Sequence, residues 1–455
     1  MTKVNAITAA VLSLSMVGCQ SSPKPTPTLA EVLRACVERQ HRAPGIVVGV
    51  ISKNGTKVVA YGKRERGNTE EVNGDTIFEI GSITKVFTTL LLQVMVDQGE
   101  VKLDDPVRKF LPSSVKIPSR NGKEITLLDL ATHTSGLPSL PDNLGSPDLD
   151  NPYADYTAER MYDFLSHCKL TRKIGSKYEY SNLGMGLLGH ALSLRAGTSY
   201  ERLIVSRICE PLHMDSTRIT LSSDMKSRLA TGHSRVGPPV RNWVSPVLQG
   251  DGALFSSVND LLKFLAASMG RSKSALSAAM AKTQVPLRRA GLFMKVGLGW
   301  HISTLDTIWH NGETGGYHSY IGFDKSTGVV VLANEANSID DIGGYVLGEQ
   351  DRIDRFKAPV QRAVAGIDYH VYDRYVGKYR FGRNDFATIS RDGDRLLVQA
   401  SGVSEFRCEL FPASETEFFL TAFDGQFKFI KNETGLVTQL LFYQDGKKQK
   451  ATRLQ

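Results

Sequence analysis

The stretch Phe78-Glu79-Ile80-Gly81-Ser82-Ile83-Thr84-Lys85-Val86-Phe87 carries the pattern on which the fold interpretation rests. A short apolar run ends at Gly81, and after Ser82 the apolar residues recur at the spacing of a buried helix as far as Met95. We therefore predict a helix that begins at Ser82, where backbone N–H groups are unpaired and the helix dipole is positive. Lys85 follows one turn later, on the same helix face as Ser82.

Ser82 and Lys85 have the chemistry of a nucleophile and its base. Burial beside an apolar helix lowers the pKa of an amine toward neutrality. A neutral lysine can take the proton of a serine, which is otherwise a poor nucleophile. The alternative is a serine that caps a helix and a lysine whose head group reaches solvent. The pattern Ser-x-x-Lys is weak by itself, since four further copies begin at Ser21, Ser113, Ser166 and Ser223, without this helical context.

Tyr180-Ser181-Asn182 is the only Tyr-x-Asn triplet in the chain, and a small, apolar, helix-like stretch follows it at 183–189. A phenol near a lysine ammonium should have a lowered pKa and can shuttle a proton to a leaving group. The amide of Asn182 can hydrogen-bond both Lys85 and a substrate carbonyl. The alternative is an asparagine in a turn beside a half-buried tyrosine.

His310-Asn311-Gly312 is the only His-x-Gly triplet. The surrounding pattern predicts a strand through residues 308–323, a turn at 324–328 and a second strand at 329–334. Glycines at 312, 315 and 316 leave one strand face bare, as required where a ligand approaches the backbone. We expect an edge strand that pairs with an extended substrate. The alternative is a glycine-rich bulge with a hydrogen-bonded histidine.

The three motifs, in this order, resemble those of the penicillin-recognising serine hydrolases, which include class C β-lactamases, D-Ala-D-Ala peptidases and esterases of the same fold. Residues 125–138 and 252–261 are similar to further segments of that family, so the likeness covers roughly residues 30–355. The resemblance implies an α+β fold in which an antiparallel sheet is flanked by helices and accompanied by an all-helical region. We expect this β-lactamase-like domain to span residues 30–357.

The resemblance also implies a role for each motif residue. Ser82 would be the nucleophile of an acyl-enzyme, and Lys85 and Tyr180 would pass its proton to the leaving group. Asn182 would position Lys85 and the substrate amide. The backbone N–H groups of Ser82 and Glu313 would form the oxyanion hole.

His310 marks a departure from class C β-lactamases, which carry Lys-Thr-Gly at this position. Histidine, with an unperturbed pKa near 6.5, holds a substrate carboxylate less firmly than lysine does. We expect His310, Gly312 and Glu313 to bind substrate, and the function to be hydrolysis of β-lactams or D-Ala-D-Ala-type peptides. The alternatives are a carboxylesterase acting on small acyl esters and a non-catalytic penicillin-binding envelope protein.

The composition is that of a soluble globular protein, because 41% of the 455 residues are hydrophobic and 22% are charged. The net charge of +8 is spread without a long basic run, so we expect no nucleic-acid partner. The expected partner is a small-molecule or peptidoglycan-peptide substrate. The chain has no Cys-x-x-Cys and no His-Glu-x-x-His, and the mechanism requires neither a metal nor a cofactor. The pattern leaves open the oligomeric state and the pairing of Cys36, Cys168, Cys209 and Cys408.

The N-terminus predicts export. Residues 1–19 have a lysine, an apolar run and a Gly18-Cys19 ending, as in a signal peptide that closes with a bacterial lipobox. Cys19 would then be lipidated, and the Pro-rich residues 20–29 would tether the protein to a membrane in the periplasm or cell envelope. The alternative is cleavage nearby and release into the periplasm.

The last part of the chain, residues 369–455, predicts a small all-β barrel or sandwich. Short alternating runs at 395–399, 427–430 and 437–442 are separated by Asp-Gly and Thr-Gly turns. The segment Tyr375-Val376-Gly377-Lys378-Tyr379 resembles the opening of the lipocalin-like domains appended to some members of the family. We expect no catalytic residues there, and a linker at 358–368.

Overall fold

The structure is a computed structural model. It describes residues 27–145, 148, 151–235, 237–291, 293–349, 363–382, 386–400, 407–420, 425–444 and 447–454. The predicted signal peptide, Cys19 and most of the Pro-rich tether lie outside the described residues. No helix within the described ranges is long and apolar enough to cross a membrane.

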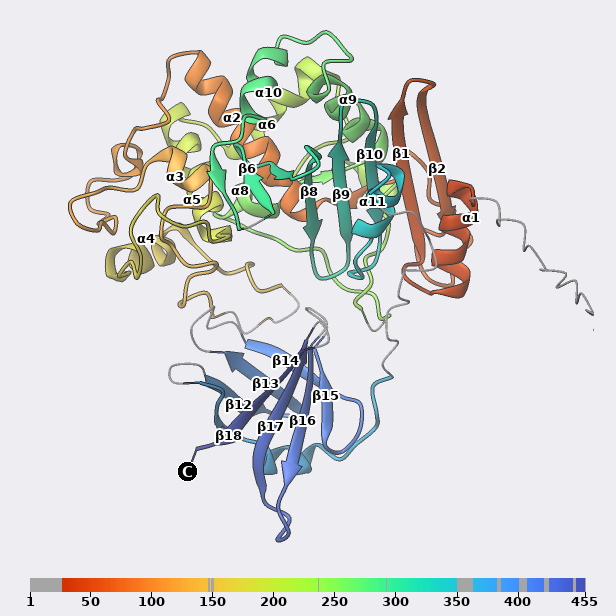
Figure 1. Ribbon diagram of the computed structural model, residues 1–455, viewed down its shortest axis with the longest axis vertical. Helices are drawn as coiled ribbons and strands as arrows, with labels where there is room; N and C mark the ends of the chain where they lie inside the picture. The colour runs from red at the N-terminus through yellow and green to blue at the C-terminus, as the bar shows by residue number, and fades with distance from the viewer. Residues whose placement is uncertain are drawn as a thin grey trace, which may run out of the picture.

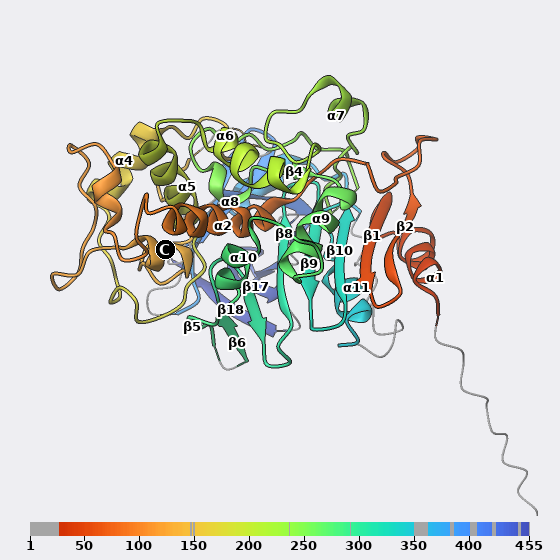
Figure 2. The ribbon, with the colours of Figure 1, turned by 90° about the horizontal axis from the view of Figure 1, so that it is seen from above.

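The N-terminal part of the chain is built on an eight-stranded antiparallel sheet with helices on both faces (Figures 1 and 2). In spatial order its strands are β2 (Gly55–Gly62), β1 (Gly45–Ser52), β10 (Gly328–Ala333), β9 (His318–Phe323), β8 (Ile308–Glu313), β7 (His301–Ser303), β6 (Met294–Val296) and β5 (Arg288–Arg289). This confirms the predicted α+β class.

The central strands are buried on both faces, so their sequences are continuously apolar. Ile46 and Val48 of β1 contribute to one cluster with α1 and α11, whereas Val47 contributes to the main core on the other face. Helix α1 (Leu29–Arg34) starts with a capping box in which Thr28 and Glu31 satisfy each other's backbone N–H groups.

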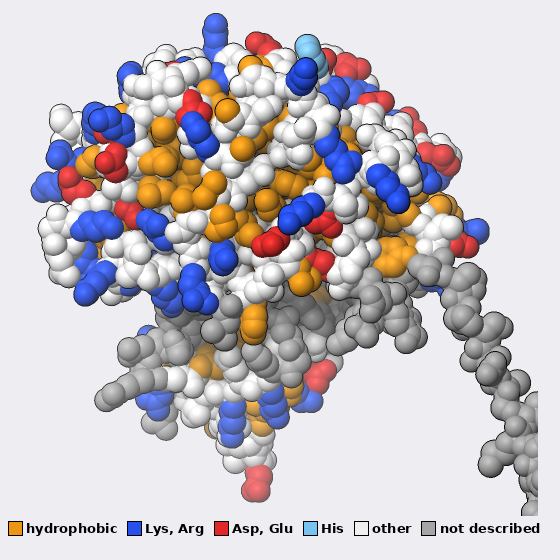
Figure 3. All heavy atoms as spheres, turned by 45° about the horizontal axis from the view of Figure 1, so that its top comes forward, with side chains coloured by type: hydrophobic (Ala, Val, Ile, Leu, Met, Phe, Trp, Pro, Cys, Tyr) orange, Lys and Arg blue, Asp and Glu red, His pale blue; other side chains and the backbone are white. Residues whose placement is uncertain are grey.

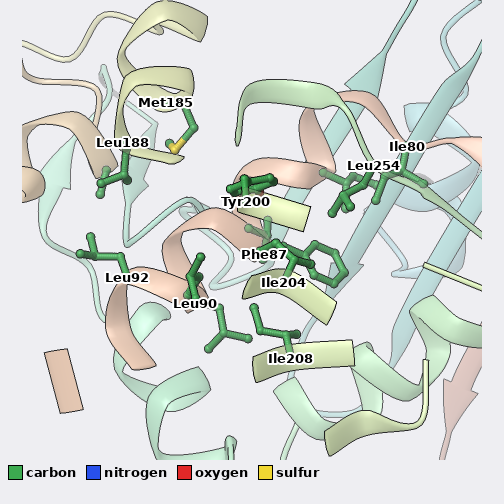
Figure 4. Close-up of a cluster of buried hydrophobic side chains, with 14 of the residues drawn as sticks. Ile80, Phe87, Leu90, Leu92, Met185, Leu188, Tyr200, Ile204, Ile208 and Leu254 are labelled. Atoms are coloured by element: carbon green, nitrogen blue, oxygen red, sulfur yellow. The ribbon is translucent and has the colours of Figure 1, made fainter. Parts of the chain in front are cut away.

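An all-helical region lies beside the β5 to β8 end of the sheet (Figure 1). The helices after α1 are α2 (Thr84–Asp97), α3 (Leu127–Ala131), α4 (Ala158–His167), α5 (Asn182–Ala196), α6 (Tyr200–Ile204), α7 (Ser223–Ser227), α8 (Gln249–Gly252), α9 (Val258–Ser268), α10 (Ser277–Thr283) and α11 (Asp340–Val346). Every residue of α2 from Thr84 to Met95 is buried. Figure 4 shows Phe87 and Leu90 of this helix in one apolar cluster with Ile204. Burying one such side chain stabilises the fold by about 1.5–3 kcal/mol, so this cluster fixes α2 firmly.

Strand β8 corrects one expectation, because it is not at the sheet edge. It pairs with β9 along its whole length, from Ile308 opposite Phe323 to Glu313 opposite His318. On its other side it pairs with β7 through Ile308 and Trp309 only. The predicted edge position was therefore wrong for β8 as a strand, because the short strands β5 to β7 extend the sheet beyond it, although residues 310–313 pair with no described strand on the β7 side.

The C-terminal part is a closed eight-stranded barrel, which confirms the predicted all-β unit (Figure 1). Its strands are β11 (Gly377–Arg380), β12 (Phe386–Asp392), β13 (Arg395–Ala400), β14 (Arg407–Pro412), β15 (Glu417–Phe419), β16 (Gly425–Lys431), β17 (Val437–Gln444) and β18 (Lys447–Arg453). Aromatic side chains fill the interior, and the rings of Tyr375 and Phe429 stack with centroids 4.4 Å apart. The barrel thus has a packed core of its own.

The surface mixes charges of both signs. Figure 3 shows Lys and Arg side chains scattered over the face in view, with Asp and Glu between them. The four cysteines that fall in the described ranges, Cys36, Cys168, Cys209 and Cys408, are all free thiols.

Candidate active site

Ser82 lies at a tight junction between a strand and a helix. Strand β3 (Phe78–Glu79), paired with β4 (Phe255–Ser256), leads into a single 3-10 turn, Gly81–Ile83, and the α-helix starts at Thr84. The predicted helix start is therefore two residues early, because the first turn is wound more tightly. Gly81 has φ +48°, and a Cβ there would stand 2.8 Å from the backbone nitrogen of Glu313. Only glycine tolerates both this positive φ and this close approach of another backbone.

Lys85 is fully buried and lies against the serine, as the one-turn spacing predicts. Its Nζ donates hydrogen bonds to Ser82 Oγ at 2.8 Å and to the backbone carbonyl of Asp251 at 2.6 Å. Burial lowers the pKa of Lys85, and the negative charge of Asp251 partly opposes that change. The amine is thus held within proton-transfer distance of the nucleophile in an environment that favours its neutral form.

Tyr180 forms the next wall of the site, with its ring centroid 4.8 Å from Lys85 Nζ. It is half-buried, and the loss of hydration raises the pKa of its phenol, while a hydrogen bond with Ser82 acts in the opposite direction. The predicted fall in this pKa was wrong, because dehydration of the phenolate outweighs the hydrogen bond with Ser82, and the negative charge of Asp251 raises the pKa further. Tyr180 therefore keeps its proton at neutral pH and is available as a donor.

Asn182 is the first residue of α5, after Ser181, whose hydroxyl caps the helix by accepting from the N–H of Gly184. Asn182 lines the same pocket as Ser82. Its Oδ1 has no hydrogen-bond partner among the described residues, and no bond joins it to Lys85 there. The carbonyl of Asp251 thus takes the place of the expected contact between Asn182 and Lys85, and the amide oxygen of Asn182 is left as a buried acceptor beside the pocket.

His310 is buried and is not among the residues that line the pocket. It is 1% exposed, and its Nδ1 lies 2.5 Å from the carbonyl oxygen of Asn311, so Nδ1 carries the proton and Nε2 is an acceptor. Burial lowers the pKa of His310 well below its usual value. The side chain is therefore neutral, rather than partly charged as expected, and contributes no cation for a substrate carboxylate.

Two further histidines surround Tyr180 and were not recognised from the sequence. The ring of His133 stacks on Tyr180 with centroids 4.5 Å apart, and its Nδ1 accepts from the backbone N–H of Ser181 at 3.1 Å. The ring of His301 stacks on His310 with centroids 4.7 Å apart. Burial lowers the pKa of both imidazoles. The proton-transfer residues are thus enclosed by neutral rings.

Gly312 and Glu313 meet the backbone of the nucleophile turn. A Cβ at Gly312 would lie 2.1 Å from the carbonyl oxygen of Ile80 and 2.9 Å from the backbone nitrogen of Ser82. The bare face of β8 is therefore occupied by the protein itself at this point, where we had expected a ligand. Glu313 lines the pocket, and its Oε1 forms an ion pair with Arg235 at 2.6 Å.

The pocket beside Ser82 is small, with a free volume of about 40 Å³. Its lining comes from six separate segments: Glu79, Gly81 and Ser82; Tyr153; Asn182; Trp243 and Ser245; Asp251, Gly252 and Ala253; Glu313 and Thr314. Glu79 and Asp251 were not among the predicted site residues. Asp251 directly precedes the recognised segment 252–261, but no spacing rule distinguishes it. Within the described residues, no Lys, Arg or His lines this pocket.

The family model described as Beta-lactamase matches residues 29–342. The chain belongs to the β-lactamase family. Together with the relatives below, this membership identifies it as a serine hydrolase. A second model, described as a domain of unknown function (DUF3471), matches residues 361–453.

Named relatives of this β-lactamase family member include peptidases. It is 30% identical over 313 residues to D-alanyl-D-alanine-carboxypeptidase/endopeptidase AmpH of Escherichia coli strain K12, covering 65% of this chain and 80% of that protein. It is 27% identical over 439 residues to penicillin-binding protein 4* of Bacillus subtilis strain 168, covering 87% of this chain and 91% of that protein. Among solved structures, the β-lactamase/D-alanine carboxypeptidase of Yersinia pestis matches with a TM-score of 0.62 and 26% identity. The match covers 70% of this chain and 98% of that one.

Proposed function

We propose that this protein hydrolyses amide bonds of D-Ala-D-Ala-type peptides or β-lactams through an acyl-enzyme on Ser82. The observation that carries the proposal is the 2.8 Å hydrogen bond between Lys85 Nζ and Ser82 Oγ in a buried setting that lowers the lysine pKa. The names of the related peptidases and β-lactamases support the same class of substrate. The backbone N–H groups of Ser82 and Glu313 are the proposed oxyanion donors.

In the proposed mechanism, Ser82 Oγ attacks the scissile carbonyl carbon as its proton passes to neutral Lys85. The bond from carbon to the leaving nitrogen breaks, and Tyr180 delivers a proton to that nitrogen while Lys85 restores the proton of Tyr180. Water then attacks the acyl-enzyme ester and releases the acid, and Ser82 regains its proton. Asn182 lines the pocket and has an Oδ1 without a partner among the described residues, so we propose that it accepts a hydrogen bond from the substrate amide.

Mass spectrometry after incubation with a penicillin tests this proposal. We expect a covalent adduct on Ser82, long-lived if the enzyme is peptidase-like and short-lived if it turns β-lactams over. Ser82→Ala should abolish the adduct. Ser223→Ala is a matched control, because Ser223 and Lys226 form another Ser-x-x-Lys pair at a helix start but are distant from these motifs in sequence. Hydrolysis by the Ser82→Ala variant at the wild-type rate would overturn the mechanism.

A carboxylesterase is the second candidate, favoured by the neutral state of His310 and by a pocket lining without a described cation. Both features weaken the hold on a substrate carboxylate, which an ester of a small acid does not need. Hydrolysis of p-nitrophenyl acetate through Ser82, with no adduct from any penicillin, would favour this assignment.

We also propose that the protein is exported and anchored in the bacterial envelope through a lipid on Cys19, with residues 20–29 as its tether. The Gly18-Cys19 ending and the Pro-rich tract after it support this assignment. Detergent-free fractionation of cells tests it: Cys19→Ala should move the protein from the membrane pellet to the soluble fraction. Equal membrane recovery of both forms would contradict the anchor.

For the C-terminal unit, residues 369–455, we propose a lipocalin-like barrel with a structural role, joined to a catalytic unit spanning 30–357. Its aromatic interior supports this role, because Tyr375, Tyr379, Phe418 and Phe429 fill the space that a ligand would need. Limited proteolysis should cut first between residues 358 and 368 and leave two resistant fragments.

A further inference from the structure

The small pocket beside Ser82 combines acidic side chains with aromatic rings. We propose that it binds a positively charged amine, so that the enzyme prefers acyl donors with a free ammonium group next to the scissile carbonyl. This inference rests on the proposed acyl-enzyme chemistry at Ser82 and names the class of acyl group that reaches it.

Asp251 is the main basis for the inference. Its side chain is 6% exposed, lines the pocket, and has an Oδ2 atom with no hydrogen-bond partner among the described residues. Its own backbone carbonyl accepts from Lys85 Nζ, which in turn contacts Ser82, so the carboxyl group belongs to the immediate surroundings of the nucleophile. No ion pair within the described part of the chain joins the Asp251 carboxylate to Lys85. Lys85 acts on this carboxylate only through space, so Oδ2 is a buried acceptor without a hydrogen bond from the described residues, and an ammonium ligand would supply one.

Glu79 is a second acid of the same kind. It is 4% exposed, and its Oε1 accepts from the backbone N–H of Trp243 at 2.7 Å. Its Oε2 makes no hydrogen bond within the described residues. Burial raises the pKa of this carboxyl to about 7, although the polar side chains of Thr314 and Asn242 beside it act in the opposite direction. A bound cation would favour the ionised form and use the free oxygen.

The other pocket residues agree with a cation rather than an anion. Glu313 is already neutralised by its ion pair with Arg235, so Asp251 and Glu79 are the acids left to meet a ligand. The rings of Tyr153 and Trp243 lie 5.4 Å apart, and aromatic faces attract ammonium groups. A substrate carboxylate would instead meet two acids.

The position and size of the pocket identify which part of the substrate it receives. Lys85, Tyr180 and His310, which lie on the proton-transfer side of Ser82, do not line it. The leaving group belongs on that side, so the pocket receives the acyl part. A volume of about 40 Å³ has room for roughly three water molecules or a group of similar size. A small α-aminoacyl group with an unblocked amine fits this space.

Two chromogenic substrates that differ only at the amine test the inference on the full-length protein. We expect D-alanine p-nitroanilide to be cleaved with a kcat/KM about ten- to a hundred-fold higher than N-acetyl-D-alanine p-nitroanilide, as a buried, charge-assisted contact predicts. In Asp251→Asn and in Glu79→Gln that ratio should fall by about ten-fold or more. Asp224→Asn should leave the ratio unchanged, because Asp224 is an exposed acid of α7 that forms an ion pair with Arg228.

The outcomes separate this inference from the proposed function. Wild-type cleavage that requires Ser82 but is equal or faster on the N-acetyl substrate overturns the ammonium site alone. The ammonium site is also overturned if the folded variants Asp251→Asn and Glu79→Gln keep the wild-type ratio of kcat/KM between the two substrates. If neither substrate nor a penicillin acylates Ser82, the proposed function fails and the inference falls with it. Inhibition of the wild type by D-alaninamide more strongly than by propionamide would support the site without any variant.

Discussion

Gly312 lies so close to Ser82 that a Cβ at position 312 would stand 2.9 Å from the serine's backbone nitrogen. Strand β8 and the nucleophile turn therefore touch backbone to backbone, with no side chain between them. Ser319 strengthens this contact, since its hydroxyl donates to the carbonyl of Ile80 at 2.8 Å. The sheet thus sets the position of the reactive serine directly.

Gly312→Ala should damage both stability and catalysis. The added methyl would also lie 2.1 Å from the carbonyl oxygen of Ile80, and relieving such overpacking typically costs about 1–3 kcal/mol. The shifted turn would misplace an oxyanion donor, so we expect kcat to fall by about a hundred-fold or more. Urea unfolding and ester hydrolysis measure the two effects. Gly366→Ala is the control, because a methyl group there would enter open space, with no neighbouring atom within 4 Å. Wild-type kcat in Gly312→Ala would contradict this account.

Lys85→Arg should be inactive although it conserves charge. A guanidinium does not lose its proton in proteins, so the variant cannot act as the base for Ser82. We expect kcat to fall by roughly a hundred- to ten-thousand-fold, measured by p-nitrophenyl acetate turnover and by adduct formation. Lys226→Arg, in the copy of the motif on α7, should behave as the wild type. If Lys85→Arg kept a tenth of the activity, another group would have to be the base.

The rate should rise with pH as Lys85 loses its proton. Because burial lowers the lysine pKa, the plateau should be reached at a lower pH than an ordinary lysine would allow. The Asp251 carboxylate stabilises the ammonium form and so raises that pKa. Asp251→Asn should therefore move the rising limb of kcat/KM to lower pH. A shift to higher pH, or no shift, would show that Asp251 does not act on Lys85 through its charge.

The neutral histidines should make the fold sensitive to acid. Burial lowers the pKa of His301 to about 4, against about 6.5 in an unfolded chain. Below pH 6.5 the unfolded state therefore binds protons that the folded state cannot, and the free energy of unfolding decreases as pH falls toward 4. For His301 the loss at pH 5 is about 2 kcal/mol. His301→Gln should flatten the dependence of Tm on pH between 7 and 5, whereas His370→Gln, in the exposed part of the barrel, should not.

Local patterns predicted the parts of the site that lie close together in sequence. The one-turn spacing of Ser82 and Lys85 gave their contact, and the apolar run to Met95 gave the buried helix. Tyr180 was recognisable because its triplet is unique and precedes a helix. The β-barrel followed from regularly spaced turns.

What could not be predicted depends on contacts between distant segments. Asp251 holds Lys85 through its backbone carbonyl. Every residue type has such a carbonyl, so the identity of residue 251 does not reveal this role. The interior position of β8 depends on β5 to β7, which are two or three residues long and too short for a periodic pattern. The neutral state of His310 results from enclosure by His301 and the sheet, which the triplet itself does not encode.

The nucleophile turn is held by segments that are far apart along the chain, with Gly312 on one side and Asp251 on the other. Each of these two contacts joins residues that are more than 150 positions apart in the sequence. Contacts between such distant residues generally form slowly during folding. A chain that is still unfolded therefore carries an ordinary serine and an ordinary lysine, and has no activated nucleophile. Covalent labelling by an acylating probe would consequently count correctly folded molecules, and the growth of that label with time would follow refolding.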